Sequence, residues 1–419
     1  MERNEAKYAH RRSSGFLKLT DPQGRPLSGK KVSIRQTNHE FLFGCGAFDS
    51  LPLTDEGEKA PSDLAFYEDR MNKWTRMFNY GTLPFYWGRY EPCEGEPQAE
   101  SRKRAANYLV SHGAKVKGHP LCWHTVCADW LMKYDNHTIL DKQLARIDRD
   151  VSGFKGLIDI WDVINEVVIM PVFDRYDNAV TRICRDLGRV GLVKEVFAAA
   201  RTANPDALLL INDFNLSESY RILIDGCLNA GVPIGAIGIQ THQHQGYKGK
   251  AWLEDVLERF SVFGLPLHFT ENSLVSGHLM PPEIIDLNDY QIPEWPTTPD
   301  GEERQAKEWK EMMEILFAHP LVEAVTGWDF ADGAWLGAPT GLIRKDNSIK
   351  PSYEALYRLI HEEWTTKKEA VTDADGMVQF DGYRGSYELE CEGAAGSFQW
   401  GKNPGTVPVV FVGTPVTAG

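Results

Sequence analysis

The stretch Trp161-Asp162-Val163-Ile164-Asn165-Glu166 follows a short apolar run, Gly156-Leu157-Ile158-Asp159-Ile160. An apolar run of this length is typical of a buried strand. An Asn-Glu pair closes the strand, although an unpaired buried carboxylate costs several kcal/mol. The pair therefore fits either a catalytic carboxylate or a structural one in a cap or ion pair, and residues elsewhere in the chain decide between the two.

Strand-like runs alternate with helical patterns on both sides of this stretch. Such alternation over about 320 residues predicts an α/β fold, a closed (β/α)8 barrel. An open doubly wound sheet is the alternative, but no glycine-rich phosphate turn follows the first strand. Strands are expected at Phe41–Phe48, Phe78–Leu83, Lys115–Trp123, Leu157–Ile164, Leu208–Asn212, Ala236–Thr241, Leu267–Thr270 and Ala324–Phe330. Helices are expected between them and at Asp63–Met77, Ser101–Ser111, Asn178–Thr202, Trp252–Phe263, Glu302–Phe317 and Tyr353–Trp364.

The two ends of the chain have β texture instead. Phe16–Leu19 and Lys31–Arg35 alternate around a turn and predict a hairpin, and further alternating runs follow residue 372. Neither end has enough strands alone, so we expect one small β-sandwich with the barrel inserted into it. The turn and alternation patterns resemble a carboxypeptidase-regulatory-like sandwich cut in two. The predicted domains are a sandwich formed by residues 13–38 and 365–419 and a barrel formed by residues 39–364. The sandwich is expected to support the barrel rather than to bind sugar.

Composition narrows the range of partners. The chain has 419 residues and a formal net charge of −14, which argues against nucleic acid and anionic membranes as partners. No apolar run approaches the roughly 20 residues of a membrane span. The polar N-terminus lacks a signal-peptide core, so we expect either a cytoplasmic protein or a trimmed secreted one, and the sequence does not decide between them. The seven cysteines include no CxxC pair and are interpreted as mostly buried free thiols, not as a disulfide framework or a zinc site. The sequence gives no indication of the oligomeric state.

Polar residues gather at the ends of the expected strands, where barrel enzymes carry their active residues. They include two glutamates, several histidines, amides and indoles. Glycoside hydrolysis needs two carboxylates flanking the bond, amides for the hydroxyls and flat aromatic faces for the sugar rings. The long connection Asn272–Gly301 leaves the barrel on the same face and is expected to be functional. The segments are Gly118–His124, Asn165–Glu166, Asn212–Asn215, Gln240–His244, Thr270–Asn272 and Trp328–Trp335.

A metal site is the less favoured interpretation of these histidines. His242 and His244 would share a face of a strand, whereas His119 and His124 would face opposite sides of a regular one. No further ligand stands at a spacing that completes a four-ligand site, so no metal or cofactor is expected. A Ser-His-Asp hydrolase is disfavoured because the chain has no G-x-S-x-G elbow.

The ordered motifs make Phe41–Ile360 resemble a glycoside hydrolase family 10 xylanase, a retaining (β/α)8 enzyme. The motifs are Phe43-Gly44-x-Gly46-Ala47, Trp87-x-x-x-Glu91-Pro92-x-x-Gly95, Gly118-His119-x-Leu121-x-Trp123-His124, Trp161-Asp162-Val163-x-Asn165-Glu166, Asn212-Asp213-Phe214-Asn215, Gly238-x-Gln240-x-His242, Thr270-Glu271 and Lys350-Pro351-x-Tyr353.

The resemblance implies a role for each matching residue. Glu166 would be the acid/base and Glu271 the nucleophile. Asn165 would bind the 2-hydroxyl of the reacting sugar, while Gln240 and His242 would position the nucleophile. The glycone side would be lined by His119, Trp123 and Trp328, with Trp335 completing the last motif. A retaining pair of carboxyls is expected about 5–5.5 Å apart.

The sequence also departs from the family pattern. The second strand of the family usually carries Glu-Asn-x-x-Lys before its Trp, but these places read Thr82-Leu83-Pro84-Phe85-Tyr86. Tyr86 therefore takes the place of the glycone-binding Lys. The Asp that follows the nucleophile motif is replaced by Ser273, and Trp335 follows Trp328 at a spacing one residue shorter than usual. Because of these changes, linear xylan is not assumed to be the preferred substrate.

Three functional hypotheses remain. The first is a retaining endo-β-1,4-xylanase or a variant for decorated xylan. The second keeps the chemistry but changes the β-linked glycan. The third is a carbohydrate-binding protein without turnover, which the retention of both Glu166 and Glu271 disfavours.

Overall fold

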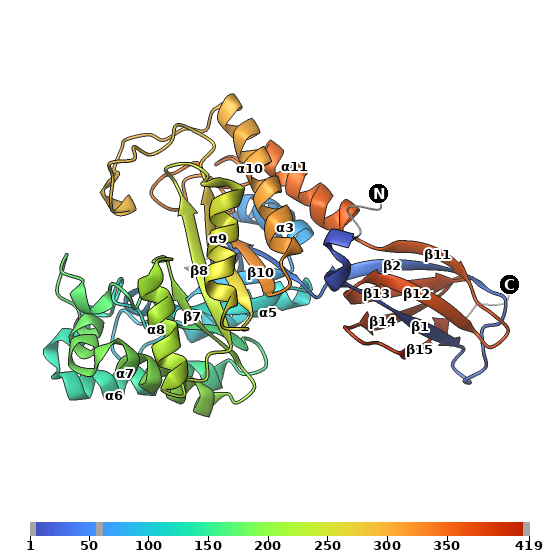
Figure 1. Cartoon of the computed structure of the whole chain (residues 1–419), viewed down its shortest axis with the longest axis horizontal. Helices are drawn as coiled ribbons and strands as arrows, with labels where there is room; N and C mark the ends of the chain where they lie inside the picture. Colours follow the sequence, from blue (N-terminus) through green and yellow to red (C-terminus); the bar gives the residue numbers. More distant parts are fainter. Residues whose placement is uncertain (1–5, 56–61, 414–419) are drawn as a thin grey trace. The chain divides into compact units, whose positions relative to one another are not determined.

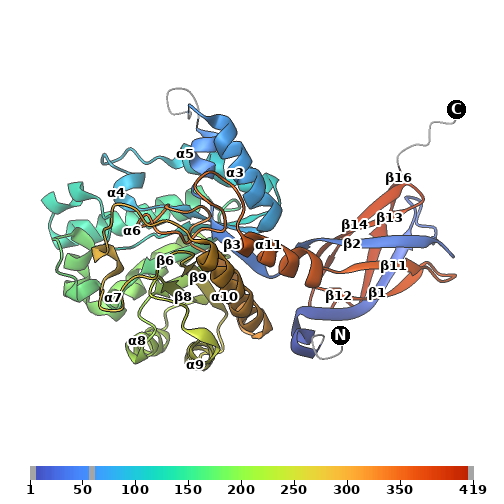
Figure 2. The ribbon, with the colours of Figure 1, turned by 90° about the horizontal axis from the view of Figure 1, so that it is seen from above.

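The structure is a computed structural model that describes residues 6–55 and 62–413. The chain divides into two compact units. One is Phe43–Ala355, and the other combines Met1–Leu42 with Leu356–Gly419. Figure 1 and Figure 2 show the larger unit as strands ringed by helices and the smaller unit as mainly β-strands.

Within the described residues, eight parallel strands close into a barrel in the order β10-β3-β4-β5-β6-β7-β8-β9. Almost all of their residues are buried, because helices cover the outside and side chains fill the inside. The closed barrel confirms the predicted fold class and excludes the open sheet. The strands are β3 (Leu42–Gly46), β4 (Tyr80–Pro84), β5 (Lys115–His119), β6 (Ile160–Asn165), β7 (Leu208–Asp213), β8 (Ala236–Gln243), β9 (Leu267–Leu274) and β10 (Val322–Gly327).

The helices between the strands begin at polar caps. Asp63, Asp135 and Asn178 each accept a hydrogen bond from a backbone N–H in the first turn of α3, α6 and α7, which satisfies a donor that the helix cannot pair internally. The helices are α2 (Ser50–Thr54), α3 (Leu64–Met77), α4 (Trp87–Tyr90), α5 (Ala99–Ser111), α6 (Asn136–Gly153), α7 (Ala179–Ala203), α8 (Glu218–Asn229), α9 (Gly249–Ser261), α10 (Pro299–Ala318) and α11 (Pro351–Arg358). Short helical turns are η3 (Asp129–Lys133), η4 (Met170–Val172) and η5 (Leu287–Asp289), and a π-turn, η6 (Leu359–Glu363), follows α11.

Three strands, β3, β5 and β10, end earlier than the sequence predicted. β3 stops at Gly46. β5 stops at His119, since Pro120 has no N–H to donate to the ladder, although Cys122 still forms an isolated parallel bridge to Ile164. The strand alternation that would place His119 and His124 on opposite faces therefore does not apply. β10 stops at Gly327, so Trp328 also lies beyond its strand.

Two glycines in the barrel make room for the side chains of Trp161 and Asn212. A Cβ at Gly118 would lie 2.1 Å from the ring of Trp161. A Cβ at Gly238 would lie 2.3 Å from Oδ1 of Asn212. Both contacts are far shorter than van der Waals distance, so glycine is required where these side chains cross the neighbouring strand.

The smaller unit is a β-sandwich made from both ends of the chain. In the part of the chain that the structure describes, one sheet has the order β12-β1-β15 and the other the order β11-β2-β13-β14-β16. Each N-terminal strand lies between two C-terminal ones. The strands are β1 (Arg12–Thr20), β2 (Lys31–His39), β11 (Lys367–Val371), β12 (Met377–Tyr383), β13 (Gly385–Cys391), β14 (Ala394–Trp400), β15 (Thr406–Val410) and β16 (Val412–Gly413), with η1 (Ala9–Arg11) before β1.

The predicted hairpin of Phe16–Leu19 and Lys31–Arg35 is wrong, because β1 and β2 lie in different sheets. Their alternation reports which face is buried, not which strand is the partner. The inward faces of both sheets form one core that includes Leu17, Ile34, Phe380 and Trp400. The exact domain boundaries, after residues 38 and 364, stay a prediction.

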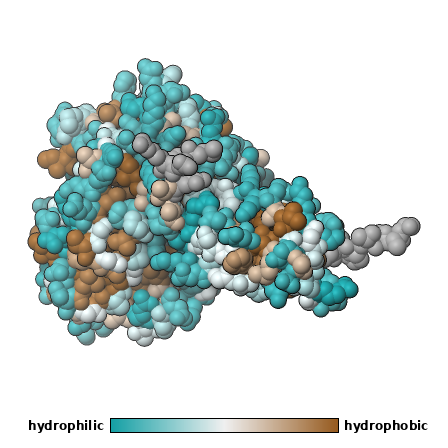
Figure 3. Space-filling model, turned by 45° about the vertical axis from the view of Figure 1, so that its right-hand side comes forward, coloured by the Kyte–Doolittle hydropathy of each residue, from teal (hydrophilic) through white to brown (hydrophobic). Residues whose placement is uncertain are grey.

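No helix among residues 6–55 and 62–413 is long and apolar enough to cross a membrane. On the face drawn in Figure 3, hydrophobic residues gather in separate patches with hydrophilic residues between them.

Candidate active site

Glu166 is the first residue after β6, at the carboxyl end of the barrel. Its φ of 57° lies in the left-handed region, which is uncommon outside glycine and is often found where function fixes a side chain. Its backbone N–H donates to the carbonyl of Asn212 at 2.8 Å. Trp123 Nε1 donates to Oε2 of Glu166 at 2.8 Å. Burial, and then the negative charge of Glu271, raise the pKa of Glu166 to about 8.

Glu271 lies in β9 and is buried. Its Oε1 accepts from Asn212 Nδ2 at 2.8 Å, and its Oε2 lies 3.1 Å from His242 Nε2. His119 Nε2 lies 3.8 Å from Oε1 of Glu271. Burial alone would raise the pKa of Glu271, but His119, His242 and Lys117 outweigh it, so the pKa is lowered. The two glutamates therefore favour opposite protonation states near neutral pH.

An amide network joins the two glutamates. Asn212 Nδ2 donates to both Glu271 Oε1 and Asn165 Oδ1, each at 2.8 Å. Gln240 Nε2 donates to Asn165 Oδ1 at 2.9 Å and lies 3.5 Å from Glu166 Oε1. Thr270 Oγ1 donates to Asn212 Oδ1 at 2.6 Å, which fixes the orientation of this amide. Residues from β6, β7, β8 and β9 thus share one hydrogen-bonded set.

Two buried charged residues, Asp162 and Lys117, hold His119 in place. His119 Nδ1 lies 2.7 Å from Asp162 Oδ2, and Lys117 Nζ lies 2.6 Å from the same oxygen. Burial tends to raise the pKa of Asp162, but Lys117 and His119 outweigh it and keep the carboxyl ionised. The imidazole is held by this carboxylate, as histidines at functional sites commonly are.

Aromatic rings border the same space. The ring of Tyr86 lies 5.8 Å from that of His119 and 5.5 Å from that of Trp123. Trp328 lies 5.3 Å from His119 and 5.9 Å from His242, and Trp335 lies 4.6 Å from His242. The structure thus brings all ten predicted site residues into one connected set.

Asn212, Asp162 and Thr270 have no role that the sequence predicts. All three lie within the sequence motifs, but their side-chain partners come from neighbouring strands, so spacing along the chain carries no signal for them. Ser273, which replaces the family's Asp, lies with its hydroxyl 3.0 Å from His242 Nδ1. The imidazole thus keeps a polar partner despite the substitution.

His242 in β8 and His244 just after it belong to no larger ligand set among the described residues. His242 and His244 have ring centroids 6.1 Å apart. Among the described residues, no group of three His, Cys, Asp or Glu side chains is placed to hold a metal ion. His244 packs instead against Trp335 and Trp295, at 5.1 and 6.0 Å between ring centroids.

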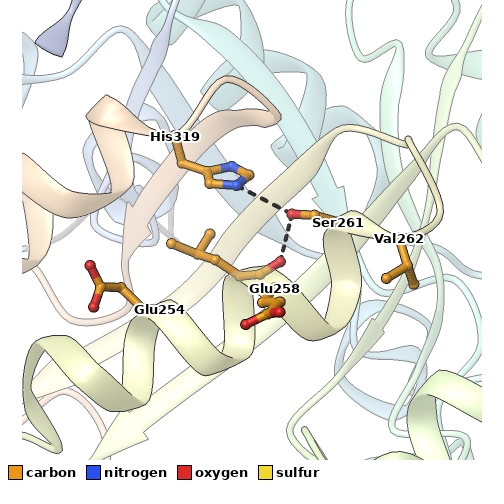
Figure 4. Close-up of a pocket in the computed structure, with 6 residues that line it drawn as sticks. Glu254, Glu258, Ser261, Val262 and His319 are labelled. Atoms are coloured by element: carbon orange, nitrogen blue, oxygen red, sulfur yellow. Dashed lines mark hydrogen bonds between the residues drawn. The ribbon is translucent and has the colours of Figure 1, made fainter.

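A surface pocket on the outside of the barrel, lined by residues of α9 and by His319, has different chemistry (Figure 4). His319 Nε2 lies 3.3 Å from Ser261 Oγ, which resembles a hydrolase dyad. However, the Ser261 hydroxyl donates to the carbonyl of Leu257, and His319 Nδ1 accepts from the backbone N–H of Leu321. The imidazole proton is therefore on Nε2, and the histidine cannot act as a base toward this serine.

Comparison with known proteins gives one family. The model of glycosyl hydrolase family 10 matches residues 74–359. The chain is 30% identical over 242 residues to a beta-1,4-xylanase of Dictyoglomus thermophilum, covering 55% of this chain and 64% of that protein. It is 24% identical over 383 residues to the anti-sigma-I factor RsgI6 of Acetivibrio thermocellus, covering 89% of this chain and 44% of that protein. The chain thus spans less than two thirds of the length of these relatives.

Solved structures show the same fold. Native xylanase 10B from Thermotoga maritima superposes with a TM-score of 0.61 at 24% identity, covering 77% of this chain and 97% of that one. A GH10 structure from Paenibacillus barcinonensis gives a TM-score of 0.62 at 22% identity, covering 77% and 95%. The family match over residues 74–359 spans more than half of the sequence, and the chain therefore belongs to glycosyl hydrolase family 10.

Proposed function

We propose that the protein is a retaining glycoside hydrolase that cleaves β-1,4-xylosidic bonds in xylan or a decorated xylan. The observation that carries this proposal is the pair Glu166 and Glu271, linked through Asn212 and Asn165 and placed in environments that favour opposite protonation states. Such a pair supplies the acid and the nucleophile of a double displacement.

In the first step, the ionised carboxylate of Glu271 attacks the anomeric carbon while Glu166 gives its proton to the leaving oxygen. A glycosyl–Glu271 ester forms, and the glycosidic C–O bond breaks. The negative charge of Glu271 is then gone, so the pKa of Glu166 falls and its carboxylate becomes a base. It takes a proton from water as the water oxygen attacks the anomeric carbon, and Glu271 leaves as a carboxylate.

The surrounding residues orient the sugar. Asn165 Oδ1 accepts from both Asn212 and Gln240, which leaves its Nδ2 as the group to donate to the 2-hydroxyl. His119 and His242 hold the carboxylate of Glu271, and the rings of Tyr86, Trp123, Trp328 and Trp335 offer faces on which pyranose rings can stack.

The xylan assignment draws on the relatives, among which are enzymes called xylanases. A second candidate, a different β-linked glycan, is favoured by one observation. Tyr86 and Leu83 stand where the family carries the Lys and Asn that hold glycone sugars. Leu83 is fully buried and adds no polar group to the site.

The test is hydrolysis of an aryl β-xylobioside followed by proton NMR of the first product. A β-anomer formed before mutarotation supports the retaining mechanism, and an α-anomer overturns it. A panel of linear, branched and acidic β-glycans, read by product chromatography, then separates xylan from the other glycans. Absence of turnover on every member would leave a carbohydrate-binding protein.

A further inference from the structure

The segments that follow the two glutamate-bearing strands contact each other across the mouth of the barrel. Arg175, in the segment after β6, pairs with Asp289 at 2.7 Å and with Asp286 at 3.2 Å. Both aspartates belong to the long connection after β9. In the barrel, β7 and β8 lie between β6 and β9, so this ion pair crosses above the ends of two strands.

The connection after β9 forms a closed loop, which we call the strap (residues 278–296). Its base is fastened by the bridge between Gly277 and Thr297. Gln245, just after β8, donates to the carbonyls of Pro281 and Ile284 at 3.0 and 2.7 Å. Met280 and Trp295 form a small core with Val275 and Ala338 at the base of the strap. The strap therefore lies over the end of β8.

The tip of the strap is only partly packed. The side chain of Ile285 is 100% exposed, whereas Ile284, Leu287 and Tyr290 are half-buried against the small core at the base of the strap. The segment that carries Arg175 is better anchored, because Arg185 donates to the carbonyls of Pro171 and Phe173 at 2.8 and 2.9 Å. Arg175 thus joins the strap to a segment that is anchored at Pro171 and Phe173.

The strap and the segment that carries Arg175 are each connected to one of the glutamates through a series of packed rings. On one side, Trp295 of the strap contacts His244, which contacts Trp335, and Trp335 contacts His242 beside Glu271. On the other side, Phe173 lies 4.5 Å from His124. His124 is next to Trp123, which donates to Glu166.

The position of the strap relative to the reaction follows from the proposed function, on which this inference rests. Glu166 gives its proton to the leaving group, so the leaving group lies on the side of Glu166, toward β6–β9. The residues assigned to the glycone side come from the opposite half of the barrel, near β4, β5 and β10. We propose that the strap, latched by Arg175, closes the leaving-group side of the candidate active site and limits cleavage of long chains.

The ion pair is exposed, with 43% of the Arg175 side chain and 55% of the Asp289 side chain accessible. Salt therefore weakens it. Opening the latch should help a polymer, which needs room beyond the cleaved bond. It should not affect an aryl β-xylobioside, whose leaving group is one small ring.

The experiment compares kcat/KM on a neutral arabinoxylan with kcat/KM on an aryl β-xylobioside. Arg175→Gln and Asp289→Asn should each raise the ratio about threefold and leave the aryl substrate unchanged. For the wild type the same ratio should rise between low and high NaCl, and for Arg175→Gln it should not. Arg221→Gln is the matched control, because Arg221 forms an exposed pair with Glu218 on α8, at 2.6 Å.

An unchanged ratio in both Arg175→Gln and Asp289→Asn would overturn the proposed latch. Activity of these variants on the aryl substrate would still support the proposed function. A parallel loss on both substrates would also overturn the latch, since that marks a structural role. A wild-type enzyme inactive on the aryl substrate and on arabinoxylan would overturn the proposed function itself, and the latch with it.

Discussion

The indole N–H of Trp123 donates to Oε2 of Glu166 at 2.8 Å, from a loop that follows β5 to the residue that follows β6. A hydrogen bond to the ionised carboxylate lowers its pKa, whereas burial and the charge of Glu271 raise it to about 8. The net effect keeps Glu166 protonated in neutral solution. The indole of Trp123 thus limits the rise in the pKa of Glu166 and also offers a face to the substrate.

A bell-shaped pH profile of kcat/KM is the first prediction. Glu166 must be protonated to act as the acid, so activity should fall as the pH rises through about 8. Glu271 must be ionised, and its pKa is lowered by His119, His242 and Lys117 against the effect of burial. Activity should therefore persist below the usual glutamate range on the acid side. Initial rates on an aryl β-xylobioside between pH 3 and 10 measure both limbs.

Trp123→Phe should shift the alkaline limb upward. The substitution removes the N–H that stabilises ionised Glu166, so the pKa of Glu166 rises by about one unit. Trp328→Phe is the control, because Trp328 is an indole of the same site whose ring contacts are to Phe48, His119 and His242. Both variants lose stacking surface, but only Trp123→Phe should move the limb. Equal alkaline limbs in the two variants would show that the indole has no such effect.

Glu271→Ala should abolish turnover on every substrate, since both steps of the reaction pass through its carboxylate. Azide can enter the space that the side chain leaves. It should restore cleavage of an activated aryl glycoside and yield an α-glycosyl azide, identified by NMR. Wild-type activity in this variant, or a β-azide product, would contradict the assignment of Glu271 as the nucleophile.

Asn212→Ala should reduce kcat/KM by about 10- to 100-fold, because one amide holds both Asn165 and the charged Glu271. Gly238→Ala should act in the same direction, since its Cβ would displace Asn212. Asn215→Ala is the control, because the Asn215 side chain bonds to Ser217 rather than to either glutamate. Equal rates for Asn212→Ala and Asn215→Ala would show that the amide network is not needed.

The split sandwich is expected to fold as one domain. Trp400 is 1% exposed and packs 5.0 Å from Phe380, so Trp400→Ala should cost about 3–5 kcal/mol of the unfolding free energy of this unit. Phe16→Ala removes a ring that is 46% exposed on β1 and should have little effect. Deleting Thr372–Gly419 removes both partners of β1 and should lower solubility. A truncated protein with unchanged melting temperature and solubility would rule out one shared domain.

The barrel was predictable because most of its strands are short, largely apolar runs that alternate with helical patterns. The end of β5 was not, since the apolar run continues past Pro120. The missing N–H of proline interrupts the regular ladder, although Leu121 and Cys122 still donate to the carbonyls of Asp162 and Val163. The sandwich strands were recognised by alternation, but alternation is the same for a partner in either sheet. The pairing of β1 with β12 and β15 depends on the tertiary fold.

The candidate site was predictable where one residue carries the chemistry, as with Glu166 and Glu271. Asn212 was noticed as part of a motif, but its role is defined by residues 47 and 59 positions away along the chain. Arg175 carried no signal at all, because its partner Asp289 is 114 residues away, in the long connection after β9. Contacts of this kind depend on the tertiary structure of the barrel and not on the local sequence pattern.

Tyr86 is the substitution with the largest consequence for specificity. Its ring is half-buried against His119 and Trp123, in the place where the family carries a Lys. A phenol offers one donor and a flat face, whereas an ammonium offers three donors and a charge. The site should therefore hold unsubstituted xylose less well, and each lost hydrogen bond to a neutral sugar is worth about 0.5–1.5 kcal/mol.

Tyr86→Lys should move the preference from branched toward linear xylan, by about tenfold in the ratio of kcat/KM values if two hydrogen bonds return. The ammonium would also lie near Glu271 and Glu166, whose charges already influence Tyr86. A cation there stabilises ionised Glu166 and lowers its pKa, so the alkaline limb should move below pH 8. Tyr86→Phe is the matched control, since it keeps the ring, adds no charge and should leave the limb in place. A wild-type enzyme as efficient on linear xylohexaose as on branched glycans would show that other residues compensate for Tyr86.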